Sequence, residues 1–423
     1  MDQLFVVLKS SVVQLAGRWL PEGALPFVSM GLTIAAIAAA APVIMMYLTW
    51  LERKIIARMQ NRLGPNRVGL YGLAQPLADG LKMLIKEDIV PEGADRLVHS
   101  LAPVVAVVPA LLVFAVLPFG RNMIAADLNV GLLYFLAVSS ISSYAIFMGG
   151  WASRNKFSLL GAMRGVAQII SYEVPSVLSV VVVIMVAGTL SMGGIVEAQA
   201  ARWFVFTPWG FVAALIFFLS GVAEVNRTPF DMPEAESEIV AGFHTEYSGM
   251  KFALWYMAEF LEAFAISAFT VTLFLGGWQG PAIPLWWVLF GSVCLVATAR
   301  TIPSVLRVLG VVACVGSGVV AYLANEAVPS WAWFLAKTYG LVFVLVWFRG
   351  TLPRLRVDQL MGLAWKFFLP LTLINIASAA LWVAMPGPSG GVLAGALLIL
   401  SGWWLIRLNN PAPLQPRTYL FVE

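Results

Sequence analysis

The sequence predicts an all-α, polytopic integral membrane protein with about 11 transmembrane helices. Of its 423 residues, 60% are hydrophobic and 11% are charged, whereas an ordinary soluble domain carries about 25% charged residues. The mean hydropathy of +0.87 agrees with this class. Apolar segments approaching the roughly 20 residues that a helix needs to cross a bilayer recur along the chain, separated by polar stretches.

The expected membrane spans follow one another with few long interruptions. Segments 207–224 and 285–299 are short and would need flanking residues or a thinned bilayer. The first 25 residues contain Lys9 and Arg18 and lack the uninterrupted apolar core of a cleaved signal peptide, so we expect an amphipathic lead-in helix there. In order, the expected spans are 28–50, 101–119, 130–151, 166–188, 207–224, 251–276, 285–299, 308–324, 332–348, 363–385 and 391–407.

Basic residues predict the orientation of these spans. If the loop after the first span is cytoplasmic, 21 of the 26 Lys and Arg residues fall in cytoplasmic segments. This asymmetry matches the excess of basic residues that cytoplasmic loops carry. It predicts an N-terminus outside and a cytoplasmic C-terminus. The basic residues left outside are Lys9, Arg18, Arg121, Arg202 and Lys337.

The first cytoplasmic loop, 51–100, contains a predicted amphipathic helix. Leu77, Leu81, Leu84 and Ile85 repeat at helical spacing, with charged residues on the other faces. Such a helix lies in the membrane interface. Each basic side chain of the loop is either a positive-inside anchor or part of a binding site.

Glu173, in the span 166–188, lies about nine residues into hydrophobic sequence. An ionised carboxylate at such a depth is costly and is usually functional. Pro175 removes a backbone donor nearby and predicts a kink beside the carboxyl group. The alternative is a protonated structural Glu that is hydrogen-bonded to the freed backbone.

The loop from Glu224 to Glu246 is rich in acidic residues. A helix beginning near Pro233 would place Glu234 and Glu238 on one face by their i,i+4 spacing. Crowded carboxylates cannot all ionise cheaply, which predicts pKa values above about 4.3, the reference value for Glu. Raised pKa values suit proton handling, and the alternative is a solvated acidic loop.

Two further carboxyl groups, Glu259 and Glu262, fall within the span 251–276. Their i,i+3 spacing puts both on one helix face. They either continue a line of carboxyl groups from the acidic loop into the membrane or are interior residues bonded to neighbouring helices.

The acidic loop also carries a family resemblance. The run 226–238, NRTPFDMPEAESE, and the run 241–249, AGFHTEYSG, resemble the signature of the quinone-chamber membrane subunit, called H, of respiratory complex I, the NADH–quinone oxidoreductase. Residues 52–54, 60–66, 75–82 and 171–175 are similar to further segments of that family. The resemblance covers about 50–276 and 340–376.

The resemblance implies a membrane subunit that forms the quinone-binding chamber and couples quinone reduction to proton translocation. It assigns quinone binding to Glu52, Arg53, Arg62, Asp79 and Lys82. It assigns proton transfer to Glu173, Glu224, Asp231, Glu234, Glu236, Glu238 and Glu246, with Glu259 as a further candidate.

The resemblance also implies the cofactors and partners. Quinone is the substrate, while NADH, FMN and iron–sulfur clusters belong to partner subunits. The partners are peripheral iron–sulfur subunits of the quinone module and membrane-arm subunits, in the inner (plasma) membrane of a bacterium, with lipid around the spans. The residues predict no metal site on this chain, because Cys294 and Cys314 form no CxxC pair and His99 and His244 lie far apart. Dispersed basic residues argue against a nucleic-acid partner.

The chain departs from the family pattern in two places. Segment 285–324 predicts an inserted helical hairpin, and 391–423 predicts an extra C-terminal helix and tail. The family core then has eight spans, in 1–276, which includes the quinone-entrance loop 51–100 and the acidic loop 224–250, and in 332–385.

Three other functions share this architecture. The membrane subunit of an energy-converting hydrogenase would have a different acidic-loop motif from the one at 226–238. A secondary ion transporter should show an internal repeat with paired broken helices, and none is evident by eye. A simple membrane anchor would gain nothing from a deep carboxyl group such as Glu173.

Overall fold

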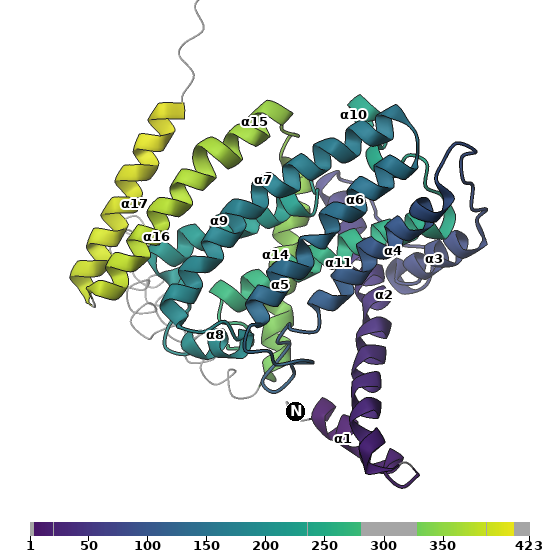
Figure 1. Cartoon of the computed structure of the whole chain (residues 1–423), viewed down its shortest axis with the longest axis horizontal. Helices are drawn as coiled ribbons and strands as arrows, with labels where there is room; N and C mark the ends of the chain where they lie inside the picture. Colours follow the sequence, from purple (N-terminus) through teal and green to yellow (C-terminus); the bar gives the residue numbers. More distant parts are fainter. Residues whose placement is uncertain (1–3, 20, 235, 281–327, 386, 410–423) are drawn as a thin grey trace, which may run out of the picture.

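The computed structural model describes residues 4–19, 21–234, 236–280, 328–385 and 387–409, and the regular elements in these ranges are all helices (Figure 1). Within them, eight helical segments are long and apolar enough to cross a membrane. This confirms the all-α polytopic prediction. The eight are α2 (Leu25–Met59), α4 (Arg96–Val113), α5 with α6 (Gly131–Ser139 and Ile141–Ala152), α7 (Lys156–Ala187), α11 (Gly249–Phe274), α14 (Ser330–Thr351), α15 through η5 to α16 (Val357–Gly362, Leu363–Phe368 and Leu369–Ala384) and α17 (Pro388–Asn409).

Shorter helices fill the connections. A ninth apolar helix, α9 (Pro208–Glu224), matches the short span expected at 207–224. Helix α1 (Leu4–Ala16) occupies the place of the lead-in helix, and α3 (Gln75–Ile85) exposes Leu77, Leu81, Leu84 and Ile85 as an interfacial helix should. The others are α8 (Met192–Ala198), α10 (Glu236–Ile239), η1 (Glu22–Ala24), η2 (Leu70–Gly72), η3 (Phe204–Phe206) and η4 (Gly242–His244).

Several helices run past their apolar segments into charged sequence. Helix α7 begins at Lys156, so much of the expected loop at 152–165 is helical. Asn155 starts it, because its side-chain oxygen accepts a hydrogen bond from the Phe157 N–H at 3.0 Å. A local side-chain cap rather than hydropathy therefore sets the start of α7. The predicted hairpin at 285–324 and the tail after Asn409 lie outside the described residues, whereas α17 contains the expected span 391–407.

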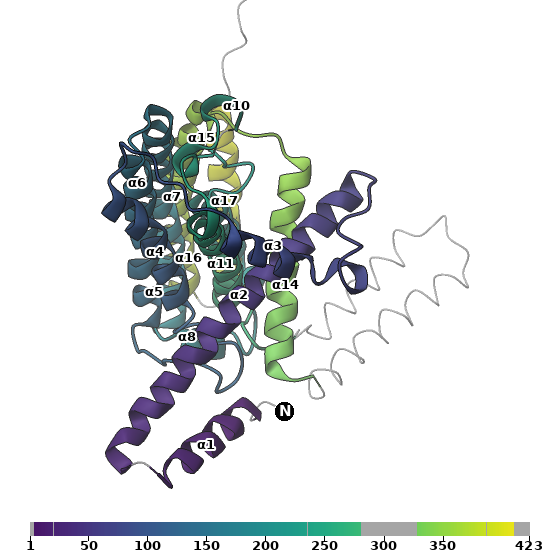
Figure 2. The same ribbon diagram turned by 90° about the vertical axis from the view of Figure 1, so that its right-hand side faces the viewer.

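The helices form a bundle around α11 and α7 (Figure 1). Helix α7 packs against α6, α9 and α16, while α11 packs against α4, α9 and α14. Figure 2 shows α2 running obliquely out of the bundle, and its N-terminal half is largely exposed. The side of the bundle near α3 and α10 carries the acidic loop.

Helix α11 is buried almost all around from Phe260 to Phe274. Aromatic stacking holds α11 in place. The ring centroids of Phe135 and Phe269 lie 3.7 Å apart, and those of Phe114 and Phe264 lie 5.9 Å apart. Such a helix should be apolar on every face. Glu259 and Glu262 break this rule, and a buried carboxyl group is costly unless it is paired or protonated. Their presence marks the region as a candidate site.

Candidate functional site

The acidic loop is folded back against a glycine-lined face of α7. A Cβ atom added to Gly161 would lie 2.8 Å from the Gly242 Cα atom, and one added to Gly165 would lie 2.9 Å from the Pro233 ring. Gly242 itself has φ of +59°, a conformation that favours glycine. The loop can therefore approach the α7 backbone more closely than any larger side chain would allow.

Gln168 fastens the start of the loop to the same helix. Its buried side-chain amide donates to the carbonyl oxygens of Ala223 and Phe230, each at 2.6 Å. These bonds satisfy loop carbonyl groups in an apolar interior, where an unpaired one would cost about 1–3 kcal/mol. The position of the loop between α9 and α11 is thus specified by residues of a third helix.

Arg227 anchors the loop by charge. Its side chain is only 4% exposed, and its guanidinium lies 3.1 Å from the Glu52 carboxylate of α2 and 2.7 Å from the Glu259 carboxylate of α11. Arg349 of α14 pairs with the other oxygen of Glu52. Two arginines and two glutamates from three helices and the loop thus form one cluster, which we call the ion cluster. Arg227, Glu52 and Glu259 are largely buried in it, whereas the Arg349 side chain is 40% exposed.

The ion cluster needs all its members. The Arg227 guanidinium also lies 4.2 Å from the Phe260 ring, which adds a cation–π contact. Burial acts to lower the pKa of Arg227, but the carboxylates of Glu259 and Glu52 raise it above its ordinary value. Because removing one partner of a buried ion pair leaves an uncompensated charge, such a change costs about 3–5 kcal/mol.

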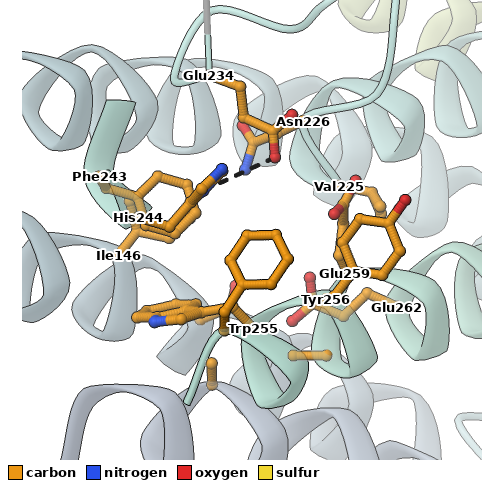
Figure 3. Close-up of a pocket in the computed structure, with 14 residues that line it drawn as sticks. Ile146, Val225, Asn226, Glu234, Phe243, His244, Trp255, Tyr256, Glu259 and Glu262 are labelled. Carbon is orange, nitrogen blue, oxygen red and sulfur yellow. Dashed lines mark ion pairs between the residues drawn. The ribbon is translucent and has the colours of Figure 1, made fainter. Parts of the chain in front are cut away.

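A cavity of about 40 Å³ adjoins the ion cluster, enough for a few water molecules at most (Figure 3). Glu234 and Asn226 of the loop border it from one side, and Tyr256, Glu259 and Glu262 of α11 from another (Figure 3). We call it the loop cavity. It brings three carboxyl groups from two distant parts of the sequence around one small polar space.

Two carboxyl groups of the loop, Glu234 and Asp231, have raised pKa values. Burial raises the pKa of Glu234 well above its ordinary value, and the neighbouring carboxylates of Glu259 and Asp231 raise it further. Burial also raises the pKa of Asp231, against the opposing charge of Arg354. His244, whose Nδ1 lies 3.9 Å from Glu234, has a pKa lowered to about 4 by burial. The imidazole is therefore neutral at physiological pH and cannot hold Glu234 ionised.

A second cavity of about 30 Å³ lies deeper in the bundle. Glu262 borders both cavities, and the inner one is also lined by Glu224 of α9 and Glu173 of α7. The Ser140 hydroxyl donates to the Glu173 carboxyl group, and α7 continues through Pro175. We call this the inner cavity. Five carboxyl groups, Glu234, Glu259, Glu262, Glu224 and Glu173, therefore border two adjoining water-sized spaces.

The helix predicted from Pro233 is wrong in its placement of Glu234 and Glu238. Residues 236–239 form only the four-residue α10, and Glu234 precedes it with its carboxyl group in the loop cavity. Glu238 is instead half-exposed and pairs with Arg164 at 2.7 Å, which lowers its pKa. The close packing of Pro233 on α7 overrides the helical spacing.

Glu246, at the end of the acidic loop, lies apart from the two cavities. Glu246 accepts a hydrogen bond from the Asn155 side chain at 2.7 Å and borders a separate surface hollow with Arg154 and Lys156. Glu236 begins α10, and its side chain lies outside the described part of the chain. The acidic run therefore divides into interior and surface groups.

The predicted quinone residues also divide. Arg53 Nη1 lies 2.6 Å from Asp79 Oδ2 and Lys82 lies 3.5 Å from Asp79 Oδ1, so these three form an exposed charged group between α2 and α3. Arg62 is exposed on the turn after α2, where it donates to the Gln60 side chain at 2.7 Å. Glu52 points the other way, into the ion cluster.

Sequence reasoning did not assign roles to several of the lining residues. The i,i+3 spacing of Glu259 and Glu262 was a usable signal for Glu262, but nothing in the sequence indicated that it borders both cavities. Arg349 directly follows an apolar span, as basic residues at the cytoplasmic end of a span commonly do, and the sequence did not indicate that it pairs with Glu52. Among the described residues, His, Cys, Asp and Glu side chains form no group of three placed to hold a metal ion.

Comparison with known proteins identifies the family to which this chain is similar. A family model described as NADH dehydrogenase matches residues 32–380. The chain is 47% identical over 348 residues to the H subunit of NADH-quinone oxidoreductase from Dehalococcoides mccartyi strain CBDB1, covering 82% of this chain and 85% of that protein. It is 45% identical over 365 residues to the H 2 subunit of the Geobacter sulfurreducens enzyme, covering 84% and 96%. Identity to the H subunit from Geobacillus kaustophilus is 46% over 330 residues, covering 78% and 86%.

The ion cluster makes a stability prediction. Replacing Glu52 by Gln leaves Arg227 and Arg349 without their shared carboxylate and should destabilise the protein by about 3–5 kcal/mol. The matched control is Asp79→Asn, which breaks a more exposed pair between α2 and α3 and should cost at most about 1 kcal/mol. Thermal unfolding of the purified complex, followed by retention of this chain, measures both. Equal losses for the two variants would contradict the assignment of Glu52 to a buried cluster.

Proposed function

This chain belongs to the NADH dehydrogenase family as a membrane subunit of NADH-quinone oxidoreductase, and we propose that it holds quinone at the membrane surface and couples quinone reduction to proton translocation. The observation that carries the proposal is the pair of adjoining cavities bordered by five carboxyl groups. They lead from the acidic loop into the membrane-spanning bundle. A membrane anchor would gain nothing from such an arrangement.

Reduction of one quinone consumes two electrons and two protons and yields one quinol. We assign the electrons to an iron–sulfur cluster on a peripheral partner subunit, which is supplied in turn from NADH through FMN on other chains. This chain then contributes binding, orientation and proton supply. The proposed arrangement places the partner on the side of the bundle that carries α3 and the acidic loop, with the membrane-arm partners against the exposed flanks.

The quinone entrance is proposed at α2 and α3. The exposed leucines of α3 offer an apolar surface at membrane height for an isoprenoid tail, and Arg53, Asp79 and Lys82 offer polar groups beside it. Arg62 follows on the adjoining turn. Binding sites of this kind combine an apolar wall with a few placed polar groups. Glu52 supports this site indirectly, because its carboxylate holds Arg227 and Arg349 in place.

The proton path is proposed to begin at Glu234 and Asp231. Both have raised pKa values and are close enough to titrate as a coupled set when charge changes at the quinone. A proton leaving Glu234 can pass through the loop cavity to Glu259 or Glu262, and from Glu262 through the inner cavity to Glu224 and Glu173. Glu238 and Glu246 are proposed as surface groups that exchange protons with the aqueous side, and Glu236, their neighbour in the loop sequence, is proposed to take part in the same exchange.

The orientation proposal follows from the basic residues. It places the acidic loop, α3 and the C-terminus on the cytoplasmic side of a bacterial inner membrane and the N-terminus outside. Quinone reduction would then draw protons from the cytoplasm, as an outward pump requires.

The quinone entrance can be tested at Arg62. Arg62→Ala removes an exposed charge from the proposed entrance, so quinone reductase turnover should fall severalfold while NADH oxidation by an artificial acceptor stays within about twofold, because electron input lies on other chains. The control is Arg58→Ala, an exposed basic residue on the same helix end. Unchanged quinone turnover in Arg62→Ala would remove this residue from the site.

The carboxyl relay can be tested at Glu262, the residue shared by both cavities. Gln keeps the shape and hydrogen bonding but releases no proton, so Glu262→Gln should lower proton pumping and coupled quinone reduction about tenfold or more. Glu262→Asp should retain part of the function. Glu197→Gln, which changes an exposed carboxyl group of α8 outside the proposed path, is the control and should pump nearly as wild type. Wild-type pumping by Glu262→Gln in sealed vesicles would break the proposed path.

A further inference from the structure

The loop cavity and the inner cavity share part of their lining. Among the residues that the structure describes, Ser142, Val225 and Glu262 border both cavities. They come from α6, from the end of α9 and from α11, so three elements meet at this point. Figure 3 shows Val225 and Glu262 on the side of the loop cavity away from His244. We call these three residues the partition, because a proton that moves from one cavity to the other passes them.

Ser142 lies just after an interruption in its span. Helix α5 ends at Ser139, and Ser140 forms a turn before α6 begins. The hydroxyl groups of Ser142 and Ser143 donate to the carbonyl oxygens of Ser139 and Ser140 at 2.8 and 2.7 Å, respectively. Serine hydroxyls often satisfy backbone groups in this way where a membrane-spanning helix is broken. This bonding does not explain the place of Ser142 at the partition, because Ser143 makes the same kind of bond and borders neither cavity.

The Ser142 hydroxyl keeps its acceptor capacity. A hydroxyl group has one proton and two lone pairs, and here the proton is donated to the Ser139 carbonyl. Within the described part of the chain, no side chain or backbone group donates to the Ser142 oxygen. The residue is half-buried and borders both cavities. Its oxygen is therefore suited to accept a hydrogen bond from a water molecule between them.

A water molecule at the partition depends on few protein groups. The cavity volumes of about 40 and 30 Å³ exceed the roughly 10–15 Å³ needed for one water molecule, and a buried water makes about 2–4 hydrogen bonds. Val225 is 1% exposed and offers no polar side-chain atom. The Glu262 carboxyl group and the Ser142 hydroxyl are thus the two polar side chains of the partition. Removing the hydroxyl would leave such a water with a single side-chain partner there.

We propose that Ser142 is a positioning residue of the proton path, whose hydroxyl holds the water molecule through which Glu262 exchanges protons between the two cavities. The inference rests on the path proposed above and adds a residue to it. The water receives a proton from the loop cavity and passes a proton to the Glu262 carboxylate, which later releases it toward Glu224. Ser142 itself neither gains nor loses a proton, since its own proton stays on the bond to the Ser139 carbonyl.

The test compares Ser142→Val with Ser142→Thr in the whole complex, reconstituted into sealed vesicles. The two new side chains have nearly the same shape, and only Thr has a hydroxyl group. Ser142→Val should lower proton pumping and coupled quinone reduction about three- to tenfold, the effect of one neutral hydrogen bond on the occupancy of the water. Ser142→Thr should stay within about twofold of wild type, and NADH oxidation by an artificial acceptor should be unchanged in both.

The solvent isotope effect separates positioning of water from a structural role. When proton transfer at the partition limits turnover, the ratio of the rates in H₂O and D₂O should rise. We expect this rise in Ser142→Val and the wild-type ratio in Ser142→Thr. An unchanged ratio in Ser142→Val, or wild-type pumping by this variant, would overturn the role of Ser142.

The matched control is Ser143→Val, which removes the neighbouring hydroxyl with the same kind of backbone bond but outside both cavities. It should pump nearly as wild type. Equal losses in Ser143→Val and Ser142→Val would assign the effect to the interrupted span, and equal losses in Ser142→Thr and Ser142→Val would assign it to filled space; either result overturns the proposal. Wild-type pumping by Glu262→Gln would overturn the path together with this inference, whereas slow pumping by Glu262→Gln with wild-type Ser142→Val would overturn this inference alone.

Discussion

The ion cluster of Arg227, Glu52, Glu259 and Arg349 is the constraint on which the site depends. Three of its charges, those of Arg227, Glu52 and Glu259, lie in the bundle interior, where an isolated ion would be prohibitively costly, so each must be matched by a partner. The matching fixes α2, α11, α14 and the acidic loop at one point. It also leaves the next carboxyl groups, Glu234 and Glu262, without a dedicated cation in the cavities they border, and such groups can gain and lose protons.

Close packing on α7 positions the loop for this role. Gly161 and Gly165 admit Pro233 and Gly242, and Gln168 bonds the loop carbonyl groups. Glu234 is thereby directed into the loop cavity, where burial and neighbouring carboxylates raise its pKa. The same packing leaves Glu238 on the surface with Arg164. Glu234 and Glu238 are only four positions apart, yet the packing of the loop on α7 places one carboxyl group among other carboxylates and the other beside an arginine.

The membrane class and most spans could be predicted from the sequence, because an apolar run of about 20 residues fits few structures besides a membrane-spanning helix. The acidic loop and Glu173 could be identified through their cost in apolar surroundings. Prediction failed where three-dimensional contacts decide. The spacing of Glu234 and Glu238 predicted a shared helix face that the structure does not form. No sequence pattern indicated that Glu52 pairs with Arg227 and Arg349. Pairing across 175 or 297 residues leaves no local pattern to read.

The central claim is that quinone reduction changes the protonation of buried carboxyl groups, and infrared difference spectroscopy of the purified complex tests it most directly. Because burial raises its pKa well above the ordinary value, Glu234 is protonated at a pH between those two values, where an ordinary Glu with a pKa of about 4.3 is ionised, and it loses its proton as pH rises through the raised value. Reduction at that pH should change a protonated carboxyl band that Glu234→Gln abolishes and Glu238→Gln leaves intact. A reduced-minus-oxidised spectrum with no carboxyl band, or one that Glu234→Gln does not alter, would contradict the account.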